Sequence, residues 1–135
     1  MQITRQADYA LRAILYLARL DTENLISTRK IAEDMLIPTS FLAKIISQLS
    51  NAGLIHTSRG THGGVSLAKP TSDISMHDIV TAIDGSVHLN ECTREDCECP
   101  FGETCPIHEV WLEAETLLIG KLVKTTVNDL LKRKK

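Results

Sequence analysis

The sequence lacks any apolar run that could cross a membrane. No stretch of about 18 consecutive apolar residues occurs in the chain, whereas a membrane-spanning helix needs about 20. The opening residues also lack the charged, apolar and small segments of a secretory signal. We therefore expect a cytoplasmic protein with no membrane partner.

Patterns typical of enzymes are missing as well. The sequence offers no Ser/His/Asp set, no phosphate-binding glycine loop and no carboxylate pair suited to acid–base work. His77 and His88 stand alone, and we interpret them as structural. Internal repeats are absent, and an apolar content of 43% over 135 residues indicates a folded chain of about one domain. We predict a protein that is not an enzyme.

A global excess of positive charge is also missing, because the net charge is −2. The charges are unevenly spread, however. Residues 1–84 carry eight basic and eight acidic side chains, residues 85–106 one arginine and five acids, and residues 107–135 six basic and four acidic side chains. Since the acidic load sits in one segment, the net charge does not exclude a local DNA-binding face.

Hydrophobic periodicity predicts a mainly helical chain. The segments with helical spacing are residues 4–19, 27–35, 39–52, 75–84, a long stretch from about 106, and 127–131. Ser27 is expected to cap the second helix and Pro38 to open the third. Polar residues 21–24 separate the first two helices, and the basic tail 132–135 is expected to fray.

A change of period after the third helix predicts a small β-hairpin. Residues 54–58 and 65–67 suit two short strands, and the glycine-rich segment 60–64 suits the turn between them. The predicted fold is therefore a mainly α winged helix-turn-helix with a long C-terminal dimerisation helix. We divide the chain into three parts: a DNA-binding domain at 1–84, a cysteine-containing cofactor loop at 85–106, and the dimerisation helix with a short terminal helix at 107–135.

The predicted helix-turn-helix suggests a surface that reads double-stranded DNA. A helix of this unit enters the major groove, where each base pair shows a distinct hydrogen-bond pattern. With the apolar stripe of the third helix facing the core, its other face presents Thr39, Ser40, Lys44 and Gln48. On the wing, Arg59 and His62 lie among flexible glycines and are placed to reach the minor groove or phosphates. The alternative is a three-helix domain whose polar faces are merely solvated.

Four cysteines lie close together, at Cys92, Cys97, Cys99 and Cys105. In a cytoplasmic chain such clustering indicates metal or redox chemistry before structural disulfides. Thiolates favour iron–sulfur clusters, zinc or copper(I), and the absence of paired Cys-x-x-Cys knuckles argues mildly against zinc. Neighbouring acids raise thiol pKa values and so oppose thiolate formation unless metal charge offsets them.

Several segments resemble the IscR/NsrR-type (Rrf-two) family of bacterial transcription regulators. They are MQIT at 1–4, DYALR at 8–12, IPTSFL at 37–42, RGTHGG at 59–64 and CPIHEVW at 105–111. The resemblance covers nearly the whole chain and implies a homodimer with a wing that touches DNA. Carried over residue by residue, it puts Ser40, Phe41, Lys44 and Arg59 at DNA-facing positions.

The resemblance also implies an iron–sulfur cluster, of two-iron or four-iron type, held by loop cysteines. Family members usually have three cysteines separated by about five to seven residues, which Cys92, Cys99 and Cys105 fit best. Cys97 is then either a replacement for Cys99 or a spare thiol. The fourth ligand stays open between His108, at the start of the long helix, and Asp8, which could reach a partner subunit's cluster.

The apolar stripe of the long helix is either packed within the subunit or a dimer seam, and the resemblance favours the seam. A dimer places two recognition helices about one DNA turn apart, so we expect a near-palindromic operator. We predict a repressor whose DNA affinity is gated by a cluster that senses redox, nitric oxide or iron and sulfur status. The alternatives are a same-fold regulator without a cluster, which senses thiol oxidation or a protein partner, and a zinc-stabilised interaction module.

Overall fold

The structure is a computed structural model that describes residues 2–20 and 25–133. The predicted polar break at 21–24 and the tail residues 134–135 lie outside the described residues. In chain order the helices and strands are α1 (Arg5–Leu20), α2 (Thr28–Met35), α3 (Thr39–Asn51), β1 (Ile55–Ser58), β2 (Gly64–Leu67), α4 (Met76–Asp84), α5 (Pro106–Lys124) and α6 (Val127–Lys132). The predicted mainly helical fold, with a hairpin and a long C-terminal helix, is confirmed.

The helices begin where the sequence offers a side chain to satisfy their free N–H groups. The Ser27 hydroxyl accepts a hydrogen bond from the backbone N–H of Lys30 and caps α2, as predicted. Ser75 opens α4 with a reciprocal capping box, in which the Asp78 carboxylate accepts the Ser75 N–H. These caps fix the starts of two helices that the apolar period locates only approximately.

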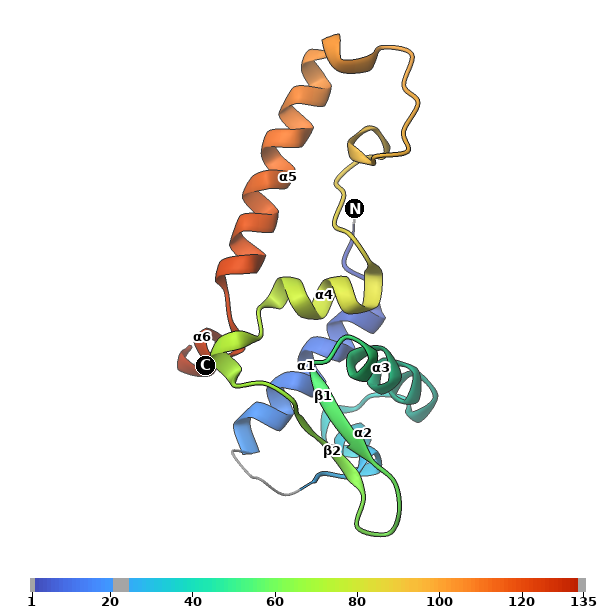
Figure 1. The fold of residues 1–135 in the computed structure, drawn as a ribbon, viewed down its shortest axis with the longest axis vertical. Coiled ribbons are helices and arrows are strands. Elements are labelled where there is room, and N and C mark those ends of the chain that lie inside the picture. Colours follow the sequence, from blue (N-terminus) through green and yellow to red (C-terminus); the bar gives the residue numbers. More distant parts are fainter. Residues whose placement is uncertain (1, 21–24, 134–135) are drawn as a thin grey trace.

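A single core holds the first four helices, the hairpin and α6 together. α1 crosses the middle of this body and contacts α3, α4 and α6 (Figure 1). The largest fully buried side chains come from every one of these parts, and they include Ile14, Ile31, Leu42, Ile45, Ile55, Ile79 and Val127. Burial on this scale makes the winged part a complete globular unit within one subunit.

The hairpin is tied to the helices at its base and free at its tip. β1 and β2 pair antiparallel, with Ile55 opposite Leu67 and Ser58 opposite Gly64. Ile26 and Val65 exchange two backbone hydrogen bonds of 3.0 and 2.7 Å, which attach β2 to the segment before α2. In the turn, a Cβ at position 63 would collide with the Ser58 carbonyl oxygen, so the tight return of the chain requires glycine there.

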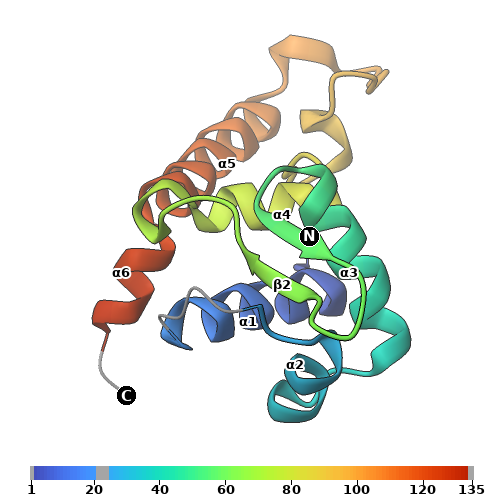
Figure 2. The same ribbon diagram turned by 60° about the horizontal axis from the view of Figure 1, so that its bottom comes forward.

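The rest of the chain forms an arm that leaves this body and returns to it. After α4, residues 85–105 run to the far end of the molecule, and α5 leads back to α6 (Figures 1 and 2). The Val127 N–H donates to the Ile74 carbonyl at 2.8 Å, and the Met76 N–H donates to the Thr125 carbonyl at 2.9 Å. We call α1–α4, the hairpin and α6 the winged body, and residues 85–124 the cysteine arm.

Candidate nucleic-acid interface and cysteine cavity

Helix α3 turns one face to the core and the other to solvent. Its buried side chains are Leu42, Ile45, Ile46 and Leu49. The opposite face exposes Thr39, Ser40, Phe41 and Lys44, the residues that the sequence assigns to DNA. No acidic side chain occurs in this helix, so its positive N-terminal end and Lys44 face solvent without a local anion. This is the electrostatic character that phosphates require.

Gln48 lies one turn further along and differs from the other four residues. It is only partly exposed, and its Oε1 atom is buried without a hydrogen-bond partner among the described residues. The wing residues Arg59 and His62, by contrast, are both exposed at the tip of the hairpin. The structure therefore gives the first turns of α3 and the wing tip the most accessible polar groups.

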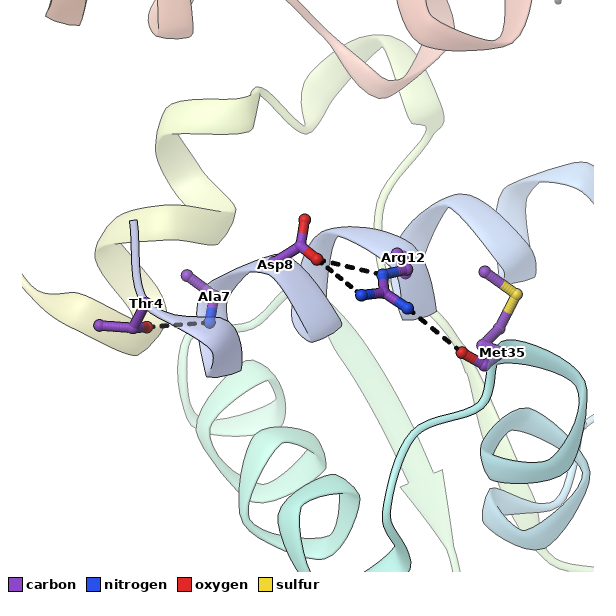
Figure 3. Close-up of polar contacts among 5 residues, drawn as sticks. All are labelled: Thr4, Ala7, Asp8, Arg12 and Met35. Atoms are coloured by element: carbon purple, nitrogen blue, oxygen red, sulfur yellow. Dashed lines mark hydrogen bonds and ion pairs between the residues drawn. The ribbon is translucent and has the colours of Figure 1, made fainter. Parts of the chain in front are cut away.

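A chain of contacts from α1 braces the start of the recognition helix. The Phe41 ring lies 6.2 Å from the Tyr9 ring, centroid to centroid, and the Arg12 guanidinium lies 5.0 Å from the Tyr9 centroid. Arg12 also pairs with Asp8 at 2.8 Å and donates to the Met35 carbonyl at 3.5 Å (Figure 3). Tyr9 has the helical spacing of an apolar residue of α1, but the sequence pattern does not predict its contacts with Phe41 and Arg12.

The turn between α2 and α3 exposes an apolar side chain that sequence reasoning missed. Leu36 has a left-handed backbone, with φ of 56°, and is 82% exposed. A left-handed residue at a helix end is usually glycine or asparagine. Nothing in the local sequence predicts a leucine in this conformation, and its neighbour Ile37 is buried.

All four cysteines line one cavity at the far end of the cysteine arm. The cavity has a volume of about 450 Å³, and Ile107, His108 and Trp111 of α5 form its other side. The four thiols are free and half-buried. Five predicted ligands, the four cysteines and His108, are thus brought together, while Asp8 lies in α1 and pairs with Arg12.

The donors of this cavity are mainly sulfur atoms, from four cysteines, with one histidine. Within residues 2–20 and 25–133, no three His, Cys, Asp or Glu side chains converge closely enough to hold a single metal ion. The thiols are instead distributed around a space of cofactor size. Iron–sulfur clusters are held mainly by cysteine thiolates, so a cavity lined by four thiols has the donor type that such a group would need.

The environment of Cys97 opposes ionisation of its thiol. Partial burial raises the pKa of Cys97, and the negative charge of Cys99, Cys92 and the nearby acids Glu91 and Asp96 raises it further. The same negative charges would favour a bound cation, and binding of any metal by thiolates is coupled to loss of the thiol protons.

A buried carboxylate ties the loop to α5. Among the described residues of α5, Glu115 alone is buried. It accepts the backbone N–H of Leu89 at 2.9 Å, and its Oε1 atom lies 3.5 Å from Nδ1 of His88. His88, which the sequence analysis interpreted as structural, therefore lies where the cysteine loop is fastened to the long helix.

Many large apolar side chains of α5 are exposed, although Leu118 and Leu122 are half-buried. Its exposed large apolar side chains are Ile107, Val110, Trp111, Leu112, Leu117 and Val123. No helix in the described part of the chain is both long and apolar enough to cross a membrane. Exposed apolar surface of this extent is typical of an interaction surface.

A helix-turn-helix with an exposed polar recognition helix, followed by a hairpin wing, defines the class of winged-helix DNA-binding regulators. The sequence profile of the Rrf2 family, described as an iron-dependent transcriptional regulator, matches residues 3–133. The chain belongs to the Rrf2 family, which confirms the resemblance. Members of this family are transcription regulators and not enzymes.

Similar proteins extend this assignment over the full length. The HTH-type transcriptional regulator NsrR of Shouchella clausii is 34% identical over 131 residues, which are 96% of this chain and 88% of that protein. The global cysteine regulator CymR of B. subtilis has a similar structure, with a TM-score of 0.82, 27% identity and coverage of 100% and 99% of the two chains. IscR of T. potens gives a TM-score of 0.77 at 26% identity, over 98% and 87% of the chains.

Proposed function

We propose that the protein is a homodimeric, sequence-specific DNA-binding repressor whose DNA affinity is gated by an iron–sulfur cluster in the cysteine arm. The observation that carries this proposal is the cavity shared by Cys92, Cys97, Cys99, Cys105 and His108. Sensing then takes place in the arm and DNA reading in the winged body. The chain works in the cytoplasm, where thiols stay reduced.

The proposed DNA binding rests on the exposed polar face of α3 and the wing tip. Thr39, Ser40 and Lys44 are assigned to base edges and neighbouring phosphates in the major groove. Phe41, braced on Tyr9, offers an apolar contact to a thymine methyl. Gln48 contributes less, because its amide oxygen is buried.

The wing supplies the contacts beside the major groove. Arg59 and His62 project from a turn whose base is fixed by Ile26 and Val65, so the tip is held at a defined height above α3. An arginine there suits the minor groove or a phosphate.

The proposed dimer rests on the exposed apolar side chains of α5. Val110 and Leu117 are exposed on one face of a helix whose only buried residue within its own subunit, among those described, is Glu115. Covering such a helix with its symmetry mate buries apolar surface on both subunits at once. Two winged bodies then face two half-sites of a near-palindromic operator about one helical turn apart.

The proposed cofactor rests on the donor atoms that line the cavity. Cys92, Cys99 and Cys105 hold the cluster, and the fourth position is a choice among Cys97, His108 and, from a partner subunit, Asp8. When bound, the cluster supplies reactivity toward oxidants and nitric oxide and a dependence on iron supply. These cysteines would hold the group as thiolates, which requires loss of their thiol protons.

Glu115 and the ends of α5 connect the cysteine loop to the DNA-binding surface. Glu115 fastens Leu89, at the start of the cysteine loop, to the middle of α5. At its other end α5 is joined to α6, which packs on α1, and α1 in turn contacts the recognition helix α3. Ligation of the loop therefore fixes the pose of α5, and with it the spacing of the two winged bodies in the dimer.

Iron and acid-labile sulfide, measured on anaerobically purified protein, test the cofactor directly. We expect a coloured protein with visible absorbance and both elements in comparable amounts. A colourless anaerobic sample without iron or sulfide refutes the cluster. Four free thiols around one cavity would then favour the alternative regulator that senses thiol oxidation, and zinc in place of iron would favour the interaction module.

A further inference from the structure

We infer that Cys97 is the fourth protein ligand, so that four thiolates of one subunit hold the cluster. This inference rests on the proposed function, because it concerns the same cofactor. The sequence leaves Cys97 and Cys99 as alternatives for a single position. In the structure the two thiols do not compete, since both line the cavity that Cys92 and Cys105 also line.

The backbone around Cys97 explains how both residues reach the same space. The Cys97 N–H donates to the Arg94 carbonyl at 3.1 Å, and the Gly102 N–H donates to the Cys99 carbonyl at 3.1 Å. Residues 97–99 therefore form a short link between two turns and belong to no helix. From this link both Cys97 and Cys99 contribute to the lining of the cavity, so the two thiols are available to one bound group.

The two other candidates for the fourth position are less well placed. Asp8 already forms an ion pair with Arg12 at 2.8 Å, and it lines a separate cavity with Thr4 and Arg5. His108 does line the cysteine cavity, from the first turn of α5. Iron–sulfur clusters favour thiolate over imidazole, so a fourth thiol on the same wall takes precedence over the histidine.

Differential thiol labelling tests this inference without a mutation. Anaerobic, cluster-loaded protein is alkylated with iodoacetamide, then stripped with a chelator, labelled with a heavier reagent and read by peptide mass spectrometry. We expect Cys97 to be protected in the loaded protein to the same degree as Cys92 and Cys105, and to react in the chelator-treated protein. If Cys97 instead carries the first, lighter label while the other cysteines are protected, the inference is overturned.

A substitution gives a second, independent readout. We expect Cys97→Ala to lower iron and sulfide per subunit several-fold, or to raise the reduction potential of any cluster that remains by recruiting a nitrogen ligand. Ser86→Ala, at an exposed position at the start of the same loop, is the matched control. Wild-type iron content together with an unchanged potential in Cys97→Ala contradicts the inference, above all if His108→Ala loses the cluster.

The outcomes separate this inference from the proposed function. Wild-type protein without iron and sulfide refutes the cluster itself, and the labelling experiment then has no loaded sample. Loaded wild-type protein with a reactive Cys97 refutes only the fourth ligand and leaves the proposed gating in place.

Discussion

The winged body buries most of its large apolar side chains, whereas helix α5 of the cysteine arm exposes many of its own. In the winged body, side chains such as Ile14, Ile45 and Val127 converge from five helices and the hairpin on one core. In the arm, α5 leaves Val110 and Leu117 in solvent and buries the carboxylate of Glu115. The body forms its core within one subunit, whereas α5 of the arm exposes large apolar side chains.

This difference separates stability from regulation. A body with a full core folds regardless of the signal, and so keeps its DNA-reading surface intact. Under the proposed function, the arm would be ordered by a partner subunit and a cofactor, and segments of low local stability are the ones that switches use. Mutations in the two regions should therefore have different kinds of effect.

The largest effect is expected from a core substitution in the winged body. Ile45→Ala removes a fully buried side chain from the inner face of α3 and should cost about 2–5 kcal/mol of unfolding free energy. Urea unfolding followed by circular dichroism measures this cost. Ser47→Ala, on the exposed face of the same helix, is the control and should stay within about 0.5 kcal/mol of wild type.

The matching substitution in the arm should spare the fold and break the dimer. Leu117 is 77% exposed, so Leu117→Asp costs the isolated subunit little but places a charge in the proposed seam. We expect a folded monomer and a loss of about 100-fold in affinity for a two-half-site duplex, since the second half-site is no longer linked. Sedimentation and DNA titration measure both. A dimer of unchanged stability would move the interface away from α5.

A smaller effect is expected at the wing tip. Arg59→Ala should weaken DNA binding about tenfold and lower the slope of log affinity against log salt by about 0.9 per subunit, because one phosphate contact is lost. Lys121→Ala, an exposed site on α5, removes the same charge from the arm and is the control. An unchanged slope for Arg59→Ala would exclude Arg59 from the phosphate contacts.

The smallest effect on DNA affinity itself is expected from Glu115. Glu115→Ala leaves the Leu89 N–H without its acceptor and should speed hydrogen exchange at residues 88–93, while the core of the winged body stays protected. The difference in DNA affinity between loaded and cluster-free protein should shrink about fivefold. Glu115→Gln, which keeps an acceptor oxygen, should restore most of it. A full difference in the alanine variant would remove Glu115 from the coupling path.

The elements of the fold could be predicted from the sequence because their signals are local. Apolar spacing located the helices, Ser27 marked the start of α2, and the glycines at 60–64 marked the wing turn. The family followed from motifs spread along the chain, and comparison with known proteins confirms it. The exposed positions of Ser40, Lys44 and Arg59 agree with the expected faces, while their role on DNA stays a prediction.

The features that the sequence did not reveal depend on tertiary contacts. Gln48 has the spacing of the exposed face, yet its amide oxygen is buried. From the sequence alone, Glu115 is an ordinary solvated acid. In the structure it accepts a hydrogen bond from the Leu89 N–H of the loop. The common cavity of Cys97 and Cys99 depends on two turns whose hydrogen bonds have no signature in the residue pattern.

The central claim, that the arm controls the body through its cofactor, is tested most directly by one pair of affinities. A duplex selected from a randomised library by anaerobic, cluster-loaded protein is titrated with that protein and with the same preparation after chelation, both at one salt concentration. We predict that the loaded dimer binds at least about tenfold more tightly, and that the duplex slows cluster loss by a corresponding shift in the binding equilibrium. Equal affinities of the loaded and cluster-free dimers would contradict the account.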